Sequence, residues 1–197
     1  MYSFSSTPSV PWVPTREEVL TYLLELLRPR IGDIIYELGC GDARVASAIA
    51  RRFPGVKVKC VELRKDLVKR ARETITKMGN LPNIEVIEGD FFQIPVKDAT
   101  IIYMYLLTSV NQKLRSKLEE ELSHGTVVVS LDFPMPGWTP VASIELPRSW
   151  QRTFYVYIVG YSDKSLSDKE ALKRGLSRLN LGRLPPGVKV YRETRWD

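Results

Sequence analysis

Between residues 33 and 131, five short apolar runs alternate with turns and amphipathic stretches, and this alternation constrains the fold more than any other feature. The amphipathic stretches that separate the runs predict helices. Strands joined by helical crossovers run parallel and are covered on both faces. We therefore expect a doubly wound α/β fold with a mostly parallel sheet, whose first five strands lie at 34–38, 56–61, 83–87, 99–106 and 126–131.

The pattern changes after residue 131. Two further strands are predicted at 141–146 and 153–161, and the segment between them is too short for a helical crossover. They should form an antiparallel hairpin at one edge of the sheet, which brings the expected number of strands to seven. We expect three regions: an N-terminal arm at 1–14, a main domain at 15–161, and a basic C-terminal tail with a short helix at 162–197.

A helix is predicted to begin at the junction of arm and main domain. Three prolines, at positions 8, 11 and 14, forbid a continuous helix in the arm. Thr15 and Glu18 are three residues apart, as in a capping box. We therefore expect Thr15 to cap the first helix.

Charge is unevenly spread along the chain. Residues 1–161 hold 20 Lys and Arg against 18 Asp and Glu, whereas residues 162–197 hold 9 against 5. An enzyme that acts on nucleic acid usually carries its basic surface beside the site. The near-neutral main domain weakens that interpretation and leaves it open, and the basic tail remains able to bind an acidic partner or nucleic acid.

Several classes of protein are disfavoured by composition. The longest unbroken apolar stretch, 101–107, is far shorter than the roughly 20 residues of a membrane span, and no secretory signal is visible. Two cysteines and one histidine supply neither a four-ligand zinc site nor a disulfide scaffold. We expect a cytoplasmic protein with reduced thiols and no metal. Only seven residues are Asn or Gln, which is typical of a thermophilic source.

The strongest local motif is the segment 37–44, Glu-Leu-Gly-Cys-Gly-Asp-Ala-Arg, where the first strand turns into a helix. Gly39 and Gly41 allow a tight turn and the close approach of a ligand. A dinucleotide-binding fingerprint requires a third glycine where Arg44 stands. Glu37 would repel a pyrophosphate, but it suits a ligand that carries an ammonium group.

Further acids follow the next two strands. Glu62 lies 21 residues after Gly41, where an acid can accept both hydroxyls of a ribose. Asp90 can accept from an adenine amino group, and Phe91 offers a stacking face. Because the carboxyl ends of parallel strands meet at one edge of a sheet, Glu37, Glu62 and Asp90 should converge on one crevice.

These residues and the final hairpin resemble the seven-stranded S-adenosylmethionine-dependent methyltransferases. Residues 9–161 more closely resemble the archaeal broad-specificity protein lysine methyltransferases, a family similar to eukaryotic mitochondrial lysine methyltransferases. The similar segments are 10–15, 37–44, 89–92, 105–108, 110–111, 132–133, 137–138 and 153–157. Four positions depart from the usual pattern. Trp12 replaces Tyr, Tyr105 replaces Phe, Asp132 replaces Glu, and Ala43 replaces Gly, the last being tolerable if its φ is negative.

The resemblance implies an archaeal enzyme that transfers a methyl group from S-adenosylmethionine to protein lysine. Glu37 would meet the methionine ammonium, and the arm would close over this end of the cofactor. The implied cofactor-binding residues are Thr15, Glu37, Gly39, Gly41, Glu62, Asp90 and Phe91. The implied lysine pocket consists of Tyr105, Phe133, Asp132 and Trp12. Its aromatic walls would disfavour the ammonium form of lysine. Tyr103 is expected to be a core residue, and Cys60 a small core residue.

Two other functions remain open. One is an RNA or DNA methyltransferase, although the Asn/Asp-Pro-Pro-Tyr/Phe device of enzymes that methylate base amino groups is missing at 105–108, and no cysteine follows the fourth strand for attack on cytosine. The other is a non-catalytic, chromatin-associated binding protein, which would have no need of the three acids. Lysine-bearing proteins, among them DNA-binding chromatin proteins, are the expected partners. The sequence has no visible coiled-coil seam, and we expect a monomer.

Overall fold

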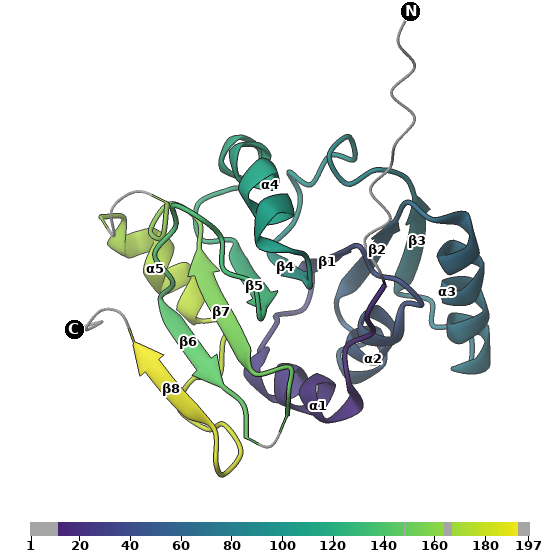
Figure 1. Cartoon of the computed structure of the whole chain (residues 1–197), viewed down its shortest axis with the longest axis horizontal. Coiled ribbons are helices and arrows are strands. Elements are labelled where there is room, and N and C mark those ends of the chain that lie inside the picture. The colour runs from purple at the N-terminus through teal and green to yellow at the C-terminus, as the bar shows by residue number, and fades with distance from the viewer. Residues whose placement is uncertain (1–11, 148, 164–166, 193–197) are drawn as a thin grey trace, which may run out of the picture.

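The computed structural model of the chain describes residues 12–147, 149–163 and 167–192. It shows one mixed sheet in the order β3-β2-β1-β4-β5-β7-β6-β8 (Figure 1). The strands are β1 (Ile34–Leu38), β2 (Lys57–Glu62), β3 (Ile84–Glu88), β4 (Ile101–Met104), β5 (Val127–Leu131), β6 (Ala142–Glu145), β7 (Thr153–Ile158) and β8 (Lys189–Arg192). The helices are α1 (Glu17–Leu26), α2 (Arg44–Arg52), α3 (Lys65–Lys77), α4 (Thr108–Glu121) and α5 (Lys169–Leu176).

The predicted α/β architecture is confirmed. Strands β1 to β5 pair in parallel, and β7 is antiparallel to both β5 and β6. One apolar cluster joins one face of the sheet to α1, α2, α3 and α5, with Leu23, Ile49 and Ala71 among its buried members. A second cluster joins the opposite face to α4 through Leu114 and Leu118. Helices therefore cover both faces, as the strand-helix alternation requires.

The strand directions bring many loops to one edge of the sheet. The parallel strands β1 to β5 all end at this edge. Since β7 is antiparallel to β5 and to β6, β6 runs in the same direction as β5 and also ends there. β8 is antiparallel to β6 and begins there, with Lys189 opposite Glu145. We call this side the carboxyl edge.

The C-terminal region adds to the sheet, which has one strand more than the seven expected. β8 pairs with β6, and α5 buries Ala171 and Leu172 in the core. The Arg178 guanidinium lies 2.9 Å from the buried Asp33 carboxylate, and the Asn180 amide donates to the Leu26 carbonyl at 2.8 Å. Residues 169–192 therefore pack on the domain rather than hang from it.

The first helix begins later than predicted. Helix α1 starts at Glu17, its N-cap residue is Arg16, and no side chain caps it. The Thr15 hydroxyl instead forms a hydrogen bond of 3.0 Å with the buried Tyr103 hydroxyl. The predicted capping box is wrong, because this partner on β4 engages the hydroxyl.

Within the described residues, no helix combines the length and the apolar character that crossing a membrane requires.

Candidate active site

The loop between β1 and α2 is a cradle of left-handed residues. Gly39 and Gly41 have φ values of 73° and 56°. A Cβ built on Gly39 would lie 3.0 Å from Leu106 Cδ2, and one on Gly41 would overlap the indole of Trp12. The two glycines thus let other groups lie directly against the backbone at the N-terminus of a helix, where the helix dipole favours negative charge on a ligand.

Ala43 has a φ of 59°, in the same left-handed region. Alanine at this position would be free of strain only with a negative φ. This condition is not met. A left-handed conformation costs a residue with a Cβ about 1–2 kcal/mol. The strain is carried by the N-cap residue of α2, whose side chain is completely buried.

Ala43→Gly is expected to raise the free energy of unfolding by about 0.5–1 kcal/mol, because relief of the left-handed strain exceeds the added entropy of glycine in the unfolded chain. Denaturant titration measures this change. The matched control is Ala46→Gly, three residues later inside α2, which should lower the free energy of unfolding by about 1 kcal/mol. Destabilisation by both substitutions would show that no strain is stored at residue 43.

Glu37 lies at the end of β1 and is 6% exposed. Its carboxylate accepts a hydrogen bond from the Ala46 amide at 2.8 Å. Burial raises the pKa of the Glu37 carboxyl well above its ordinary value, and the nearby acids Asp42 and Glu62 raise it further. The charge of Arg44 offsets only part of this rise, and a ligand ammonium would supply a further cation for the ionised form.

Glu62 lies at the end of β2 and is also 6% exposed. One carboxylate oxygen accepts from the Gly41 amide at 2.9 Å, and the other accepts from the Arg64 amide at 2.9 Å. The carboxylate is thereby fixed against the glycine loop. Each oxygen keeps a second lone pair, so two adjacent hydroxyls of a ligand could donate to it.

A disulfide joins the same loop to β2. Cys40, between the two glycines, is bonded to Cys60, which lies two residues before Glu62. Both cysteines are buried. The prediction of reduced thiols is wrong, whereas Cys60 does lie in the core as predicted. The parallel pairing of β1 with β2 brings the two Cα atoms to 5.4 Å, which is within disulfide geometry.

Asp90 and Phe91 follow β3, toward the same loop. One Asp90 carboxylate oxygen accepts from the Phe92 amide at 2.9 Å and so holds a tight turn. The Phe91 ring approaches the glycine loop, since a Cβ on Gly39 would lie 3.8 Å from its Cε1 atom. The structure therefore brings Glu37, Glu62 and the segment 90–91 to neighbouring positions around one loop.

The arm is anchored across the site by a residue that sequence reasoning missed. The fully buried Gln151, between β6 and β7, donates to the Pro14 carbonyl at 3.0 Å and accepts from the Arg16 amide at 2.8 Å. A polar residue in a hairpin turn gives no signal of burial, so only the tertiary structure shows this role. Together with the bond between Thr15 and Tyr103, it fixes the end of the arm over β4.

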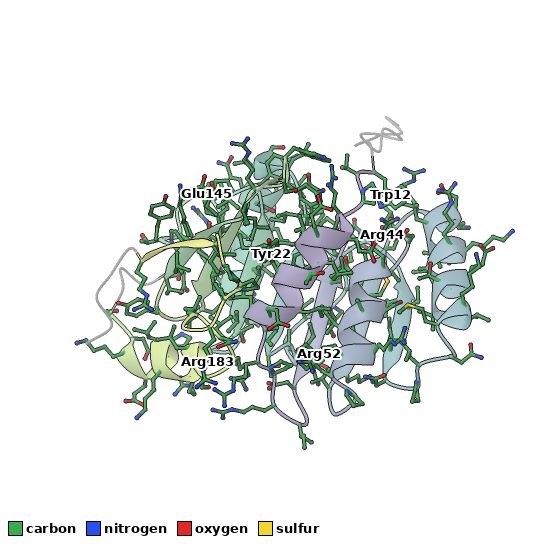
Figure 2. All side chains as sticks on the ribbon, turned by 90° about the horizontal axis from the view of Figure 1, so that it is seen from below. Trp12, Tyr22, Arg44, Arg52, Glu145 and Arg183 are labelled. Carbon is green, nitrogen blue, oxygen red and sulfur yellow. A yellow bond between two sulfur atoms is a disulfide. The ribbon has the colours of Figure 1, made fainter. Side chains whose placement is uncertain are left out.

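Trp12 lies over the glycine loop. Its ring is 5.9 Å from the guanidinium carbon of Arg44 and 5.9 Å from that of Arg70. Figure 2 shows Trp12 and Arg44 close together, with Glu145 far from both. The structure thus places Trp12 at the loop of Gly41, and the other three residues of the expected lysine pocket lie together elsewhere.

Those three residues follow β4 and β5. The Tyr105 and Phe133 rings stack, with centroids 5.8 Å apart. Asp132 has a φ of 58°, and one of its carboxylate oxygens accepts from the Arg152 amide at 2.7 Å and the Thr153 amide at 3.1 Å. The Tyr105 hydroxyl interacts with Gln151 and Asp132, and burial raises its pKa.

The carboxyl edge is therefore divided by chemistry. Fixed acids and a glycine cradle follow β1, β2 and β3, whereas stacked aromatic rings and a rigid carboxylate follow β4 and β5. The first set fits a ligand with an ammonium group, a ribose and an adenine, and the second fits a cationic side chain. Among the residues described, no group of three His, Cys, Asp or Glu side chains could hold a metal ion.

Comparison with known families and proteins gives consistent matches. The sequence model of the ANTKMT methyltransferase domain family matches residues 37–142. A protein-lysine N-methyltransferase of Saccharolobus islandicus is 38% identical over 79% of this chain and 98% of its own length. The adenine nucleotide translocase lysine N-methyltransferase of Mus musculus is 33% identical over 68% of this chain, and the match spans only 58% of that protein.

Two solved structures are also similar. The crystal structure of an RNA methyltransferase from Salinibacter ruber in complex with S-adenosyl-L-homocysteine has a TM-score of 0.67 and 39% identity, and the match covers 75% of this chain and 94% of that one. A precorrin-6y C5,15-methyltransferase from Geobacter metallireducens has a TM-score of 0.57, 14% identity and coverage of 74% and 89%, which shows the fold alone.

Proposed function

Because the chain belongs to the ANTKMT methyltransferase family and is an S-adenosylmethionine-dependent protein-lysine N-methyltransferase, we propose that it acts on lysines of several proteins. The observation that carries the activity is the 38% identity that extends over 98% of the Saccharolobus enzyme. The support for broad specificity is the resemblance of residues 9–161 to a broad-specificity family. A monomeric state and a cytoplasmic location stay predictions. So do chromatin proteins as substrates, and the binding of nucleic acid through the basic C-terminal region.

The cofactor is held by the glycine loop and its neighbours. Glu37 faces the methionine ammonium, Glu62 the ribose hydroxyls, and Asp90 and Phe91 the adenine. Gly39 and Gly41 let the chain approach the cofactor closely, and Thr15 holds the arm at its methionine end. The support is the set of acceptors itself: a buried carboxyl with a raised pKa, a carboxylate with two free lone pairs, and an acid beside an aromatic ring.

Cofactor affinity is expected to fall as the pH falls through the raised pKa of Glu37. Below that pKa the carboxyl is neutral and gains little from an ammonium, whereas above it the ionised form is stabilised by the cation. The stability of the cofactor-free protein depends on pH in the opposite direction. Because folding raises the pKa of Glu37, ionisation of this carboxyl lowers the free energy of unfolding as the pH rises. Calorimetry from pH 5 to 8 measures the affinity. Glu37→Gln should bind weakly and with a flatter pH profile, and an equally steep profile would assign the effect to another group.

The lysine pocket works by positioning and desolvation. The bound cofactor supplies an electrophilic methyl group, which only a neutral amine can attack. The stacked Tyr105 and Phe133 rings exclude water, which lowers the pKa of an entering lysine. The Asp132 carboxylate attracts the incoming ammonium, which releases its proton to solvent as it enters the pocket. The carboxylate then accepts a hydrogen bond from the neutral amine. Alignment and desolvation supply the catalysis, so no general base is assigned.

Asp132→Asn is expected to lower kcat/KM for a protein substrate by roughly 10- to 100-fold, in line with the loss of one charge-assisted hydrogen bond. The asparagine oxygen can still accept from the Arg152 and Thr153 amides, and asparagine tolerates the left-handed backbone at this position. The fold and the affinity for cofactor should therefore persist. Steady-state kinetics with labelled cofactor measures the change, and unaltered kinetics would remove Asp132 from the pocket.

A second candidate substrate is RNA. It is favoured by the 39% identity to the Salinibacter structure, which is described as an RNA methyltransferase. A labelled methyl-transfer assay on host cell extract separates the two functions when samples are treated with nuclease or with protease. Label that survives nuclease, is lost to protease and maps to lysine supports the proposed function. Label confined to nucleic acid would overturn it.

A further inference from the structure

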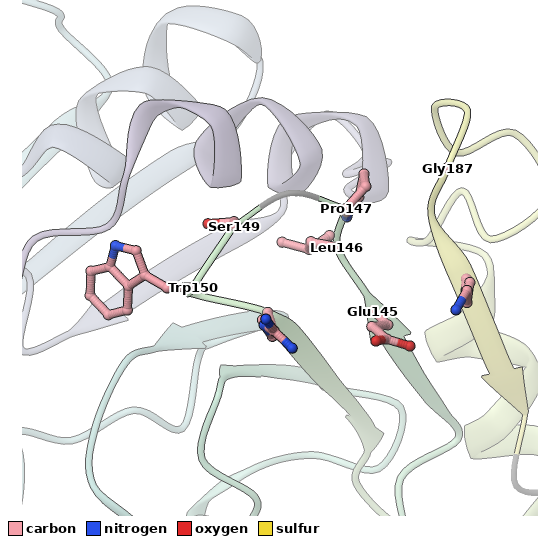
Figure 3. A pocket seen from close by; sticks show the side chains of 8 residues that line it. Glu145, Leu146, Pro147, Ser149, Trp150 and Gly187 are labelled. Atoms are coloured by element: carbon pink, nitrogen blue, oxygen red, sulfur yellow. The ribbon is translucent and has the colours of Figure 1, made fainter.

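The half of the carboxyl edge beyond the lysine pocket contains a groove that neither the cofactor nor the lysine side chain uses. It has a volume of about 480 Å³ and lies between the end of β6, the turn before β7 and the start of β8 (Figure 3). Its lining residues are Glu145, Leu146, Pro147, Ser149, Trp150, Arg152, Gly187 and Lys189. All eight lie outside residues 37–142, which match the family model, and Gly187 and Lys189 lie in the C-terminal region.

The strand order places this groove in line with the rest of the site. Along the carboxyl edge, the ends of β3, β2 and β1 carry the cofactor residues, and the ends of β4 and β5 carry the lysine pocket. The groove then follows at β7, β6 and β8. The link is direct, since the Arg152 backbone amide holds the Asp132 carboxylate at 2.7 Å. A chain that places a lysine against Tyr105 would continue into the groove.

Exposed apolar side chains gather at the same edge. In the described part of the chain, five of the seven exposed large apolar side chains lie in the arm, after strand ends or in the β6–β7 turn: Val13, Leu63, Phe92, Leu107 and Trp150. Trp150 is 56% exposed and stands at one end of the groove, with Gly187 at the other (Figure 3). Tryptophan is enriched among the residues that dominate the binding energy of protein interfaces.

The described lining residues of the groove carry a net positive charge of one, from two cations and one acid. Within the described residues, neither Arg152 nor Lys189 has an acidic partner within 4 Å. The single acid of the groove, Glu145, accepts a hydrogen bond from the Tyr191 hydroxyl at 3.2 Å. Two cations against one acid, beside an exposed indole, complement a peptide that has acidic and apolar side chains.

We propose that this groove binds the segment of the protein substrate next to the target lysine, and that it selects acidic and apolar flanking residues. The inference rests on the proposed function and adds its substrate preference. It also gives the C-terminal region a role, because β8 forms one wall of the groove. The phosphates of an RNA would meet the same cations, so RNA is an outcome that the test must separate.

The test compares two synthetic peptides of equal length with one central lysine, one with Glu and Leu flanks and the other with Ser and Gly flanks. Wild-type enzyme is expected to have a KM about tenfold lower for the acidic peptide, a difference of about 1.4 kcal/mol. The double variant Arg152→Glu with Lys189→Glu should lose this preference, and Trp150→Ala should raise KM for both peptides. Affinity for S-adenosylmethionine should stay unchanged in both variants, because the groove lies at the other end of the carboxyl edge from the cofactor residues.

The matched control is Lys169→Glu with Lys173→Glu, two exposed cations of α5 that reverse the same charge outside the groove. This control should keep the wild-type preference. The proposed role of the groove would be overturned if the wild type labelled lysine in extract proteins but did not prefer the acidic peptide. A groove variant that kept the preference would overturn it as well. Either result would leave the proposed function standing. An enzyme that labels no protein lysine would overturn the proposed function itself. RNA labelling that the groove variants abolish would assign the groove to RNA.

Discussion

Glu62→Ala is expected to lower the affinity for S-adenosylmethionine by roughly 100-fold or more, since each hydrogen bond to a charged group contributes about 1.5–3 kcal/mol. The Glu62 carboxylate has two roles, one toward the glycine loop and one toward the cofactor. It accepts hydrogen bonds from the Gly41 and Arg64 amides at 2.9 Å each, and in the proposed complex its remaining lone pairs would accept from the ribose hydroxyls. Removal therefore deprives the cofactor of its acceptor and the glycine loop of its anchor. Isothermal calorimetry measures the affinity, and Glu85→Ala, an exposed acid on the neighbouring β3, is the control.

The two contributions of Glu62 can be separated with a cofactor analogue. Wild-type protein should bind S-adenosylhomocysteine more tightly than its 2′-deoxy analogue, because the analogue lacks one donor to the carboxylate. In the Glu62→Ala variant this difference should nearly vanish, and the coupling between the two changes isolates the ribose contact from the loop anchor. Equal penalties for the deoxy analogue in both proteins would show that another group receives the hydroxyl and that Glu62 acts on the loop alone.

Local patterns were sufficient to predict most of the fold. The apolar runs and amphipathic stretches between residues 33 and 158 predicted the order of strands and helices along the chain correctly, with strand boundaries that differ by at most three residues. β8 was missed because four residues of edge strand, of which three are exposed, carry no apolar periodicity that distinguishes them from an extended tail. Its partner β6 lies more than forty residues earlier in the sequence.

Site residues could be predicted where their chemistry and their position after a strand both indicate a role. They could not be predicted where the contact depends on how distant strands pair in the sheet. Acids after successive strands indicate a shared crevice from their spacing alone. The disulfide depends on the register that sets Glu37 opposite Cys60, which no local pattern specifies. The role of Thr15 depends on Tyr103, 88 residues away, and the left-handed φ of Ala43 depends on the whole loop.

Reduction of the Cys40–Cys60 disulfide is expected to lower the free energy of unfolding by about 3 kcal/mol, the loop-closure value for a sequence separation of 20 residues. For a chain of this length, that corresponds to a fall in Tm of about 6–12 °C. Both sulfurs are buried, so reductant must reach them through unfolding. Denaturant titration with and without reductant, started from the unfolded chain, gives the two stabilities of one sequence and avoids a cavity from substitution.

The double variant Cys40→Ala with Cys60→Ala serves as the control, because reductant should leave its stability unchanged. If the wild type were equally stable with and without reductant, the disulfide would make no contribution to the free energy of unfolding. The cofactor gives a second readout, since the bond fixes residue 40 between the two glycines and ties it to the strand of Glu62. If the crosslink acts on the unfolded chain alone, reduced and oxidised folded protein bind S-adenosylmethionine equally. A weaker affinity of the reduced form would mean that the disulfide also preorganises the glycine loop for its ligand.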